Sequence, residues 1–401
     1  MPRIATLEDV RRRARRRLPR MAFDFIDGGA DREITLRANT AAFESTVLRP
    51  RHLVDVTHRS PATTVLGEPV ALPVLIAPTG MARIAHPAGD LAGARAAARA
   101  GTIFTLSTMS SHSMEEVRAA ADGPLWFQVY LWPQRAVVQR LVYRAQAAGY
   151  RALVVTVDVP VAGNRLRDVA NGFSFPPRVR PSTAADLLRH PRWLAGLPSA
   201  MTFANVAEQV GDGPARSLEY ARLVNRLLAN PGADWGLLAW LRERWPGPLL
   251  IKGTLTGEDA RLAIEHGVDG IVVSNHGGRQ LDGAPAALHA LTEVVEAVAG
   301  RAEVLLDGGV RSGSDVITAV AMGARAVLIG RPWLFGLAIG GEDGVALVLE
   351  ILREEVDRTL ALTGRAGVAD LGPPLIGRAG VADLGPDLIG PPDERTAVSR
   401  H

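Results

Sequence analysis

Short apolar runs that each end in polar or small residues recur along most of the chain, and they constrain its fold more than any other feature. Eight runs are candidate strands: Val74–Pro78, Ile103–Leu106, Leu125–Tyr130, Leu153–Asp158, Leu249–Lys252, Ile271–Asn275, Val304–Asp307 and Val327–Gly330. Most gaps between them have room for a loop and an Ala-rich helix. Continuous hydrophobicity is typical of parallel strands covered on both faces. Eight such units predict an α/β fold, a (β/α)8 TIM barrel.

One gap is far longer than the others and lies after the fourth run. It predicts an insertion over residues 173–235, and loops at that end of a barrel strand hang over the catalytic mouth. A lid is the functional interpretation, and a flexible loop is the plain one. A patch around Trp193 that touches a membrane surface is a third.

Both ends of the chain carry unusual segments. Near the N-terminus, RRRARRRLPRM predicts a helical extension with Val10, Ala14 and Leu18 on one face and solvated arginines on the rest. Near the C-terminus, RAGVADLGPPLIG is followed directly by RAGVADLGPDLIG. Two copies are too few for a solenoid. Residues 366–401 are therefore expected to be a surface tail behind one barrel domain of residues 1–365.

The composition excludes several classes of protein. The 45 basic and 42 acidic residues give a net charge of only +3, which is too small to indicate nucleic-acid binding. The absence of cysteine excludes disulfides, iron–sulfur clusters, thiolate zinc sites and cysteine nucleophiles, and no metal site is expected. The sequence begins without the apolar core of a signal peptide and contains no run of 18 apolar residues. A cytoplasmic protein is therefore expected.

Polar residues gather where the expected strands end, which is where a barrel of this kind carries its chemistry. They are Thr79, Ser107, Gln128, Tyr130, Thr156, Asp158, Lys252, Ser274, Asn275, His276, Arg279, Asp307, Arg311 and Arg331. The last two strands end in LLDGGVRSGSD and LIGRP. Glycine lets backbone N–H groups approach an anion and arginine offers a forked donor, so the two loops together predict a phosphate site. A tight strand-to-helix turn is the alternative for either loop alone.

The stretch SNHGGRQLDG places an imidazole and a guanidinium three residues apart. Little bulk flanks His276, and Asp158 could accept its N–H bond and stabilise an imidazolium, as proton abstraction requires. Arg279, with Arg165 from AGNRLRD, could clamp a carboxylate. Lys252 has three comparable interpretations: a Schiff-base nucleophile, a positive charge beside a cofactor, or a structural residue at the rim.

The sequence resembles the FMN-dependent α-hydroxy acid oxidases and dehydrogenases over residues 4–365. The matching segments, in order, are RLPRMAFDFIDGGADRE, LPVLIAPTG, WFQVY, TVDVPVAGNRLRD, LIKG, SNHGGRQLDG, LLDGGVRSGSD and IGRP. The resemblance implies that FMN contacts Pro78, Thr79, Ser107, Gln128, Thr156 and Ser274. It implies a phosphate site formed by Gly309, Arg311, Gly330 and Arg331, with Asp307 nearby.

The resemblance also implies catalytic roles. His276 would be the base, Asp158 its partner, and Tyr130 a hydrogen-bonding group for the substrate. Arg279 and Arg165 would clamp the substrate carboxylate, and Lys252 would place its charge beside the flavin. The implied reaction oxidises an (S)-2-hydroxy acid to the 2-oxo acid, and a quinone, another carrier or O2 then reoxidises the flavin.

Two substrate-contacting positions depart from the family pattern. Phe25 stands where the resembling lactate and glycolate enzymes have a tyrosine, and one lost hydrogen bond is worth roughly 1 to 3 kcal/mol. Met109 stands where glycolate oxidase has a tryptophan, and its side chain is narrower and more adaptable. A roomier, more apolar pocket is therefore expected, which suits mandelate or 4-hydroxymandelate, with L-lactate as a further possibility.

Several alternatives stay open at this point. Oxidation of an amine or a modified peptide would use the same scaffold, a Schiff-base aldolase would use Lys252, and a non-catalytic binding role is a third option. Gly80 in APTG stands where several oxidases of the resembling family carry alanine and its dehydrogenases tend to have glycine, so the resemblance favours a dehydrogenase. The resemblance further implies a homotetramer or larger homo-oligomer. The segment LLRHPRWLAGL resembles a stretch of membrane-associated relatives, which predicts peripheral contact with the inner face of the membrane.

Overall fold

The computed structural model describes residues 4–173, 181–191, 193–195, 203–207 and 230–378. At its centre is a closed barrel of parallel strands, ordered β10-β11-β4-β5-β6-β7-β8-β9 around the ring. The strands are β4 (Val74–Ile76), β5 (Phe104–Ser107), β6 (Leu125–Tyr130), β7 (Ala152–Thr156), β8 (Leu249–Thr254), β9 (Gly270–Val273), β10 (Glu303–Asp307) and β11 (Ala326–Ile329). The predicted barrel is confirmed, and each predicted strand is present to within two residues at either end.

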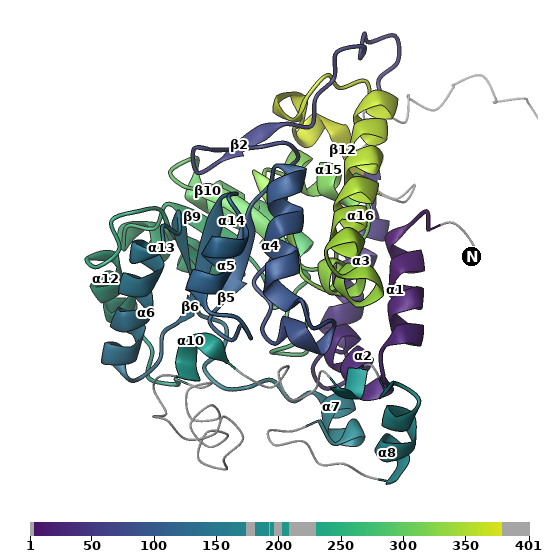
Figure 1. The fold of residues 1–401 in the computed structure, drawn as a ribbon. Coiled ribbons are helices and arrows are strands. Elements are labelled where there is room, and N and C mark those ends of the chain that lie inside the picture. Colours follow the sequence, from purple (N-terminus) through teal and green to yellow (C-terminus); the bar gives the residue numbers. More distant parts are fainter. Residues whose placement is uncertain (1–3, 174–180, 192, 196–202, 208–229, 379–401) are drawn as a thin grey trace, which may run out of the picture.

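A helix follows each barrel strand and covers its outer face (Figure 1). These helices are α4 (Gly89–Ala100), α5 (Met114–Ala120), α6 (Arg135–Ala147), α12 (Trp235–Arg242), α13 (Gly257–Glu265), α14 (Ala287–Val298), α15 (Gly313–Ala321) and α16 (Arg331–Thr363). Every residue of β4, β5, β7, β9 and β11 is buried, and β4, β9 and β11 carry no polar side chain on either face.

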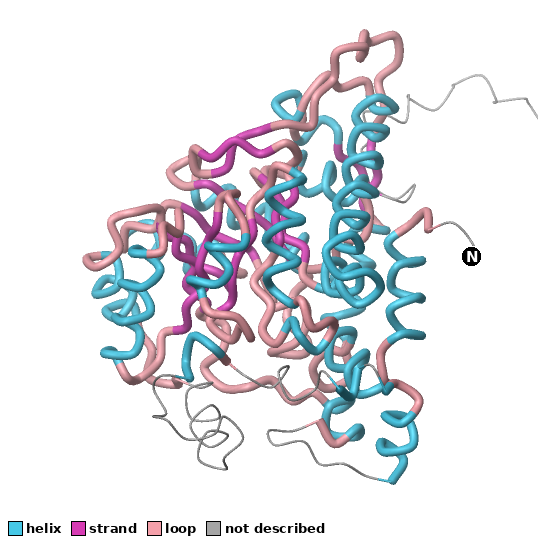
Figure 2. The backbone as a smooth tube through the Cα atoms, in the orientation of Figure 1, coloured by secondary structure: helices cyan, strands magenta, loops and turns pink. Residues whose placement is uncertain are grey.

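Alternate strand residues belong to two separate apolar clusters, as the two-residue period of a strand requires. One cluster includes Leu75, Val154 and Leu328, and it also includes Val65 and Val70 from a hairpin. This hairpin, β2 (Thr63–Val65) and β3 (Glu68–Val70), covers the amino end of the barrel. Figure 1 shows β2 at the end of the molecule opposite α2, α7 and α10. The carboxyl end of the barrel is left for loops, which Figure 2 shows in pink beside the short helices.

The N-terminal extension forms three helices: α1 (Leu7–Arg17), α2 (Arg20–Asp27) and α3 (Ile34–Glu44). The predicted apolar face is confirmed, because Val10, Ala14 and Leu18 are all buried, and α1 packs against α16. The side chain of Thr6 accepts a hydrogen bond from the backbone of Asp9, whose carboxylate in turn accepts one from the Thr6 backbone. This capping box defines where the helix begins.

The predicted insertion of residues 173–235 lies largely outside the described residues. Beside it, α7 (Leu166–Asn171) lies near α2, and within it the described parts include α8 (Pro181–Leu188) and α10 (Ala204–Ala207). The indole N–H of Trp193 donates to the Ile84 carbonyl at 2.6 Å, so this side chain is held against the barrel. Among the described residues, no helix is long and apolar enough to cross a membrane.

The structure describes the first copy of the C-terminal repeat. The first copy packs onto the body: β12 (Ile376–Arg378) pairs antiparallel with β1 (Thr46–Leu48), and Leu375 is fully buried. The expectation of a surface tail beginning at residue 366 is therefore corrected for this copy. The pairing of β12 with β1 and the burial of Leu375 hold this copy on the body, and neither can be predicted from the presence of a repeat. Apart from Arg378, the second copy lies outside the described residues.

Candidate active site

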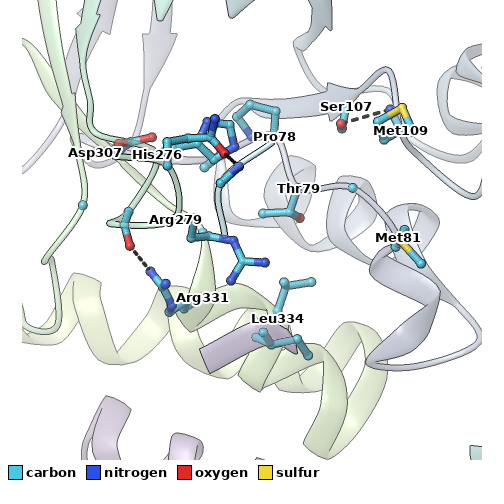
Figure 3. A pocket seen from close by; sticks show the side chains of 18 of the residues that line it. Pro78, Thr79, Met81, Ser107, Met109, His276, Arg279, Asp307, Arg331 and Leu334 are labelled. Atoms are coloured by element: carbon cyan, nitrogen blue, oxygen red, sulfur yellow. Dashed lines mark hydrogen bonds between the residues drawn. The ribbon is translucent and has the colours of Figure 1, made fainter. Parts of the chain in front are cut away.

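A cavity of about 640 Å³ opens at the carboxyl ends of the barrel strands. Its lining brings together most of the predicted residues, part of which are shown in Figure 3. They are Phe25, Pro78, Thr79, Ser107, Met109, Gln128, Tyr130, Thr156, Arg165, Lys252, His276, Arg279, Asp307, Gly309, Arg311, Gly330 and Arg331. Asp158 and Ser274 do not line it but contact its lining residues from behind.

His276 and Asp158 form a hydrogen-bonded pair at the mouth of the barrel. The distance between Nδ1 of His276 and Oδ1 of Asp158 is 2.9 Å. Burial alone would raise the pKa of Asp158, but the charge and hydrogen bond of His276 and the charge of Lys252 lower it. With Asp158 ionised, Nδ1 of His276 is the donor, so Nε2 keeps its lone pair. The ring lines the cavity and can accept a proton there.

A glycine makes room for this pair. Gly253 has φ +115°, and a Cβ at this position would lie 2.7 Å from the Asp158 Cβ. Any side chain here would therefore displace the carboxylate. On the other side, the His276 backbone is left-handed, with φ 58°, and its N–H donates to the Ser274 hydroxyl at 3.0 Å. A strained backbone at a functional position is consistent with an orientation that the surroundings impose.

Arg165 and Arg279 place two guanidinium groups beside one aromatic ring. Their Cζ atoms lie 6.0 Å and 5.2 Å from the centroid of the Phe25 ring. Burial lowers the pKa of Arg165, and burial together with Arg165 and Arg331 lowers that of Arg279 well below its ordinary value. Asp168 lies close enough for its charge to oppose both shifts. Because one carboxylate, Asp168, faces two guanidinium groups, an excess of positive charge remains. An anionic ligand would compensate it.

At the predicted phosphate end of the cavity, the Arg331 side chain is held by backbone carbonyls. Its Nε, Nη1 and Nη2 donate to the carbonyls of Asp27, Gly277 and Gly28 at 3.1, 2.9 and 2.8 Å. The side chain is therefore held by backbone groups, and its charge, its two remaining N–H groups and the amino end of α16 are left for an anion. Burial, with Arg311 nearby, lowers the pKa of Arg331 to about 9. Sequence alone did not reveal these carbonyl partners.

Arg311 and Gly309 complete that end of the cavity. Burial lowers the pKa of Arg311, and its Nη1 donates to the Val310 carbonyl at 2.8 Å. Gly309 has φ +90°, and a Cβ there would lie 2.2 Å from the carbonyl oxygen of Asn39. Glycine is thus required where the backbone passes closest to α3.

Lys252 is a buried cation rather than a neutral amine. Its Nζ lies 2.9 Å from Oδ2 of Asp307 and 2.9 Å from the Ser274 hydroxyl, and the residue is 3% exposed. Burial would lower the pKa of Lys252, but the charges of Asp307 and Asp158 more than offset it, so the pKa is raised. A Schiff-base nucleophile needs the opposite shift. The contacts therefore favour the second of the three interpretations, a positive charge beside a cofactor.

Several buried polar atoms around the cavity have no hydrogen-bond partner among the described residues. They are Thr79 Oγ1, Gln128 Nε2, Asp158 Oδ2, Arg165 Nε and Asp307 Oδ1. Buried polar groups are normally paired, and leaving one unpaired costs about 1 to 3 kcal/mol. These atoms belong to strands β6 and β10 and to the loops after β4 and β7, so a single group that paired with all of them would have to be extended rather than one small ion.

The site includes residues that sequence reasoning missed. Phe173 and Phe203, which border the undescribed parts of the insertion, line the cavity, as do Asp168 and Val169. The rings of Phe25 and Phe173 lie 4.5 Å apart between centroids. No signal in the sequence placed these residues, because each reaches the mouth from a segment without strand periodicity.

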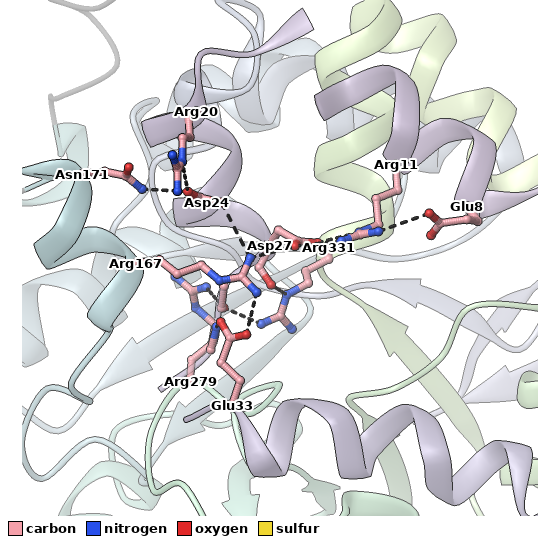
Figure 4. Close-up of polar contacts among 12 residues, drawn as sticks. Glu8, Arg11, Arg20, Asp24, Asp27, Glu33, Arg167, Asn171, Arg279 and Arg331 are labelled. Atoms are coloured by element: carbon pink, nitrogen blue, oxygen red, sulfur yellow. Dashed lines mark hydrogen bonds and ion pairs between the residues drawn. The ribbon is translucent and has the colours of Figure 1, made fainter. Parts of the chain in front are cut away.

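A network of ion pairs beneath the cavity was also missed (Figure 4). The carboxylate of Asp27, at the end of α2, accepts from Arg11 at 2.7 and 3.0 Å and from Arg167 at 3.1 Å. Arg167 also pairs with Glu33. Since the Asp27 carbonyl accepts from Arg331, this residue ties α1, α2, α7 and α16 together. The AGNRLRD motif thus supplies one arginine to the cavity and another to the network beneath it.

The fold and this cavity define a (β/α)8-barrel enzyme with a histidine–carboxylate pair and two cationic regions. A family model described as FMN-dependent dehydrogenase matches residues 14–378. The chain belongs to this family of FMN-dependent α-hydroxy acid oxidases and dehydrogenases. It is an oxidoreductase whose cofactor is FMN. The names of its relatives support the oxidation of a 2-hydroxy acid as its reaction.

Individual relatives carry different substrate names. A putative L-lactate dehydrogenase of Mycobacterium tuberculosis is 45% identical over 371 residues, covering 92% of this chain and 88% of the relative. An L-lactate oxidase of Nostoc sp. is 46% identical over 362 residues, covering 89% and 94%. Among solved structures, a monotopic membrane protein, (S)-mandelate dehydrogenase, aligns with a TM-score of 0.89 at 40% identity, covering 94% of this chain and 100% of that one.

Proposed function

We propose that this protein oxidises bulky or aryl (S)-2-hydroxy acids such as mandelate or 4-hydroxymandelate, with L-lactate as a poorer substrate. The observation that carries the proposal is the position of two buried, charge-rich guanidinium groups, Arg165 and Arg279, against an aromatic ring that has no hydroxyl, Phe25. The first feature suits a carboxylate. The second leaves an apolar face beside it.

The reacting end of the substrate would lie between the arginines and the imidazole. With its carboxylate on Arg165 and Arg279, the α-carbon and its hydroxyl face His276, whose free Nε2 takes the proton. Asp158, kept ionised by its lowered pKa, stabilises the resulting imidazolium. Burial and the Asp158 charge raise the pKa of Tyr130 to about 12, so its hydroxyl stays protonated and can donate to the substrate.

The unpaired polar atoms support FMN in the same cavity. The Thr79 hydroxyl and the Gln128 amide would bind the flavin ring. Four further residues would contact it: Pro78, Ser107, Thr156 and Ser274. The charge of Lys252 would stabilise an anionic ring edge. Gly309, Arg311 and the amino end of α16 at Gly330 and Arg331 would receive the phosphate, with Asp307 behind Lys252. When bound, FMN supplies a two-electron acceptor.

The aryl preference rests on the remaining lining. Phe25 and Phe173 form an aromatic pair beside the arginines, and Met109, Phe203 and Val169 add apolar surface. An aryl side chain buried there gains hydrophobic and aromatic contact energy that a methyl group or a hydrogen does not. Phe25 cannot replace the hydrogen bond that a tyrosine would give a small substrate.

The test is a comparison of kcat/KM for (S)-mandelate, L-lactate and glycolate, with (R)-mandelate as the stereochemical control. The proposal predicts the order mandelate, lactate, glycolate, and little turnover of the R enantiomer. A preference for glycolate would refute the aryl pocket.

Three alternatives from the sequence have less support. Oxidation of an amine or a modified peptide would not need the paired arginines, and an aldolase would need a neutral lysine where the pKa of Lys252 is raised. A non-catalytic binding role would leave the His276–Asp158 pair without a purpose.

We further propose that the electron acceptor is a quinone or another carrier rather than O2. Gly80 supports this, because several oxidases of the family carry alanine at this position. A Cβ at Gly80 would lie 2.9 Å from the Met109 Cβ, so an alanine here would press on a residue that lines the substrate pocket. Rates with an artificial acceptor and with O2 as sole acceptor, measured on one preparation, test this. A reaction equally fast with O2 alone would contradict it.

Assembly and location are also proposals. The family resemblance supports a homo-oligomer, which light scattering of the purified protein would measure. Leu188 and Leu194 are exposed hydrophobic residues of the insertion, at 74% and 37%, and they support peripheral membrane contact. Co-sedimentation with anionic lipid vesicles, compared between the intact chain and a Leu188→Ser variant, would test it.

A further inference from the structure

A second cavity of about 390 Å³ adjoins the first on the outer side of strands β7 and β8. Tyr130, Thr156 and Val159 line both cavities, so the two cavities adjoin at these residues. The volume falls within the range of small-molecule sites. The family's hydroxy acid and FMN belong to the first cavity, and the second holds none of the predicted catalytic residues except this shared wall.

Two residues that line the second cavity carry a buried polar atom without a hydrogen-bond partner among the described residues. Thr254 Oγ1 and Trp132 Nε1 belong to lining residues that are each 2% exposed, and neither atom has a hydrogen-bond partner among the described residues. An indole nitrogen can only donate, and a hydroxyl can donate as well as accept. Two buried donors at one cavity fit a ligand with carbonyl oxygens.

The rest of the lining defines the ligand further. The rings of Tyr130 and Trp132 stack at 6.2 Å with an interplanar angle of 18°, and Trp235 is a third aromatic lining residue. Among the described residues, no lysine, arginine or histidine lines this cavity, whereas the exposed carboxylates of Asp234 and Asp259 do. A hydroxy acid anion is therefore disfavoured, and a planar neutral ring is favoured.

We propose that this cavity binds a neutral aromatic carbonyl compound of the quinone class, the electron acceptor of the reaction. The inference rests on the proposed function, because it assigns the acceptor of that same site. In the overall reaction the hydroxy acid loses two electrons and two protons and becomes the 2-oxo acid. The quinone gains two electrons, and its two oxygens take two protons and become the hydroxyls of a hydroquinone.

The experiment uses the oxidised, FMN-loaded protein and the probe 2-methyl-1,4-naphthoquinone, with binding followed by calorimetry. Val157 lines only this cavity and is 37% exposed, so Val157→Trp should fill the site without disturbing the core. Its matched control is Val161→Trp, a 60% exposed valine of the same loop that lines neither cavity.

We expect Val157→Trp to weaken quinone binding at least about tenfold, and Thr254→Val to weaken it about three- to tenfold through one lost hydrogen bond. Val161→Trp should bind as the parent does. The KM for the quinone should rise in the two cavity variants, while anaerobic reduction of the flavin by (S)-mandelate stays unchanged.

Equal quinone affinity in Val157→Trp and Val161→Trp would overturn the proposal. Displacement of the quinone by (S)-mandelate, or binding of phenethylamine in its place, would overturn the ligand class. If no hydroxy acid reduced the flavin but the quinone still bound with these variant effects, the substrate assignment would fail and the quinone site would stand.

Discussion

Oδ1 of Asp158, directly after strand β7, lies 2.9 Å from Nδ1 of His276, which follows β9 across the intervening strand β8. The contact joins residues 118 positions apart in the sequence, and it decides which imidazole nitrogen is free to act as a base.

Replacing the partner of the base should slow the chemical step. Asp158→Asn keeps the shape but removes the negative charge that stabilises an imidazolium, so flavin reduction by (S)-mandelate should slow by about a hundredfold or more. Stopped-flow bleaching of the flavin measures the rate. Asp122→Asn, at an exposed position, is the control. An unchanged rate in Asp158→Asn would remove the carboxylate from the mechanism.

Lys252→Met should make the bound flavin harder to reduce. The positive charge of Lys252 favours the anionic reduced form, and a loss of about 1.4 to 2.8 kcal/mol corresponds to a reduction potential lower by about 30 to 60 mV. The single change also leaves Asp307 as a buried carboxylate without its ion pair. The double variant Lys252→Met, Asp307→Asn should therefore recover part of the potential. Spectroelectrochemistry giving the same potential in all three proteins would contradict this placement.

Phe25→Tyr should shift the substrate preference toward small acids. A hydroxyl near the guanidinium groups of Arg165 and Arg279 would add a hydrogen bond to the substrate, worth roughly 1 to 3 kcal/mol. The ratio of kcat/KM for glycolate over mandelate should rise by about five- to a hundredfold. Phe25→Leu, which is apolar and has no hydroxyl, is the matched control and should show no gain with glycolate.

The network around Asp27 should make stability depend on pH in the acid range. Burial by itself would raise the pKa of Asp27, but the hydrogen bond and charge of Arg11, with Arg331 and Arg167, lower it. As the pH falls below the ordinary value of 3.8, the unfolded chain binds this proton before the folded chain does. The stabilisation is therefore complete above that pH and is lost as the pH falls through the lower folded value.

Urea unfolding between pH 6 and 2 would measure this dependence. Asp27→Asn should be less stable at pH 6 by about 1 to 3 kcal/mol, since Arg11 is partly exposed, and its stability should fall less steeply below pH 4. Parallel pH curves for the parent and the variant would show that Asp27 is not the titrating group.

The sequence predicted the barrel and the strand-end residues because one rule governs both. A buried parallel strand is a continuous apolar run, and its last residue marks the catalytic end, so Gln128, Lys252 and Asp307 could be placed without a structure. Phe173 and the Asp27 network could not be placed, since they depend on how α2 and α7 dock. Arg331 shows the same limit: its position was predicted, but its three carbonyl partners come from distant segments.

The C-terminal repeat was misjudged for a related reason. The two copies differ at one position and so have nearly the same local propensities, and the pairing of Ile376–Arg378 with β1 depends on a distant segment of the chain. Whether a segment docks onto the body is a tertiary property that local sequence does not contain.

The central claim, that this cavity holds FMN and delivers an aryl hydroxy acid to His276, is tested most directly by an anaerobic absorption spectrum. The flavin band of the purified protein would be recorded during separate titrations with (S)-mandelate, L-lactate and glycolate. The account predicts bleaching of the band by mandelate at much lower concentration than by the other two. A bound flavin that none of the three acids bleaches would contradict it.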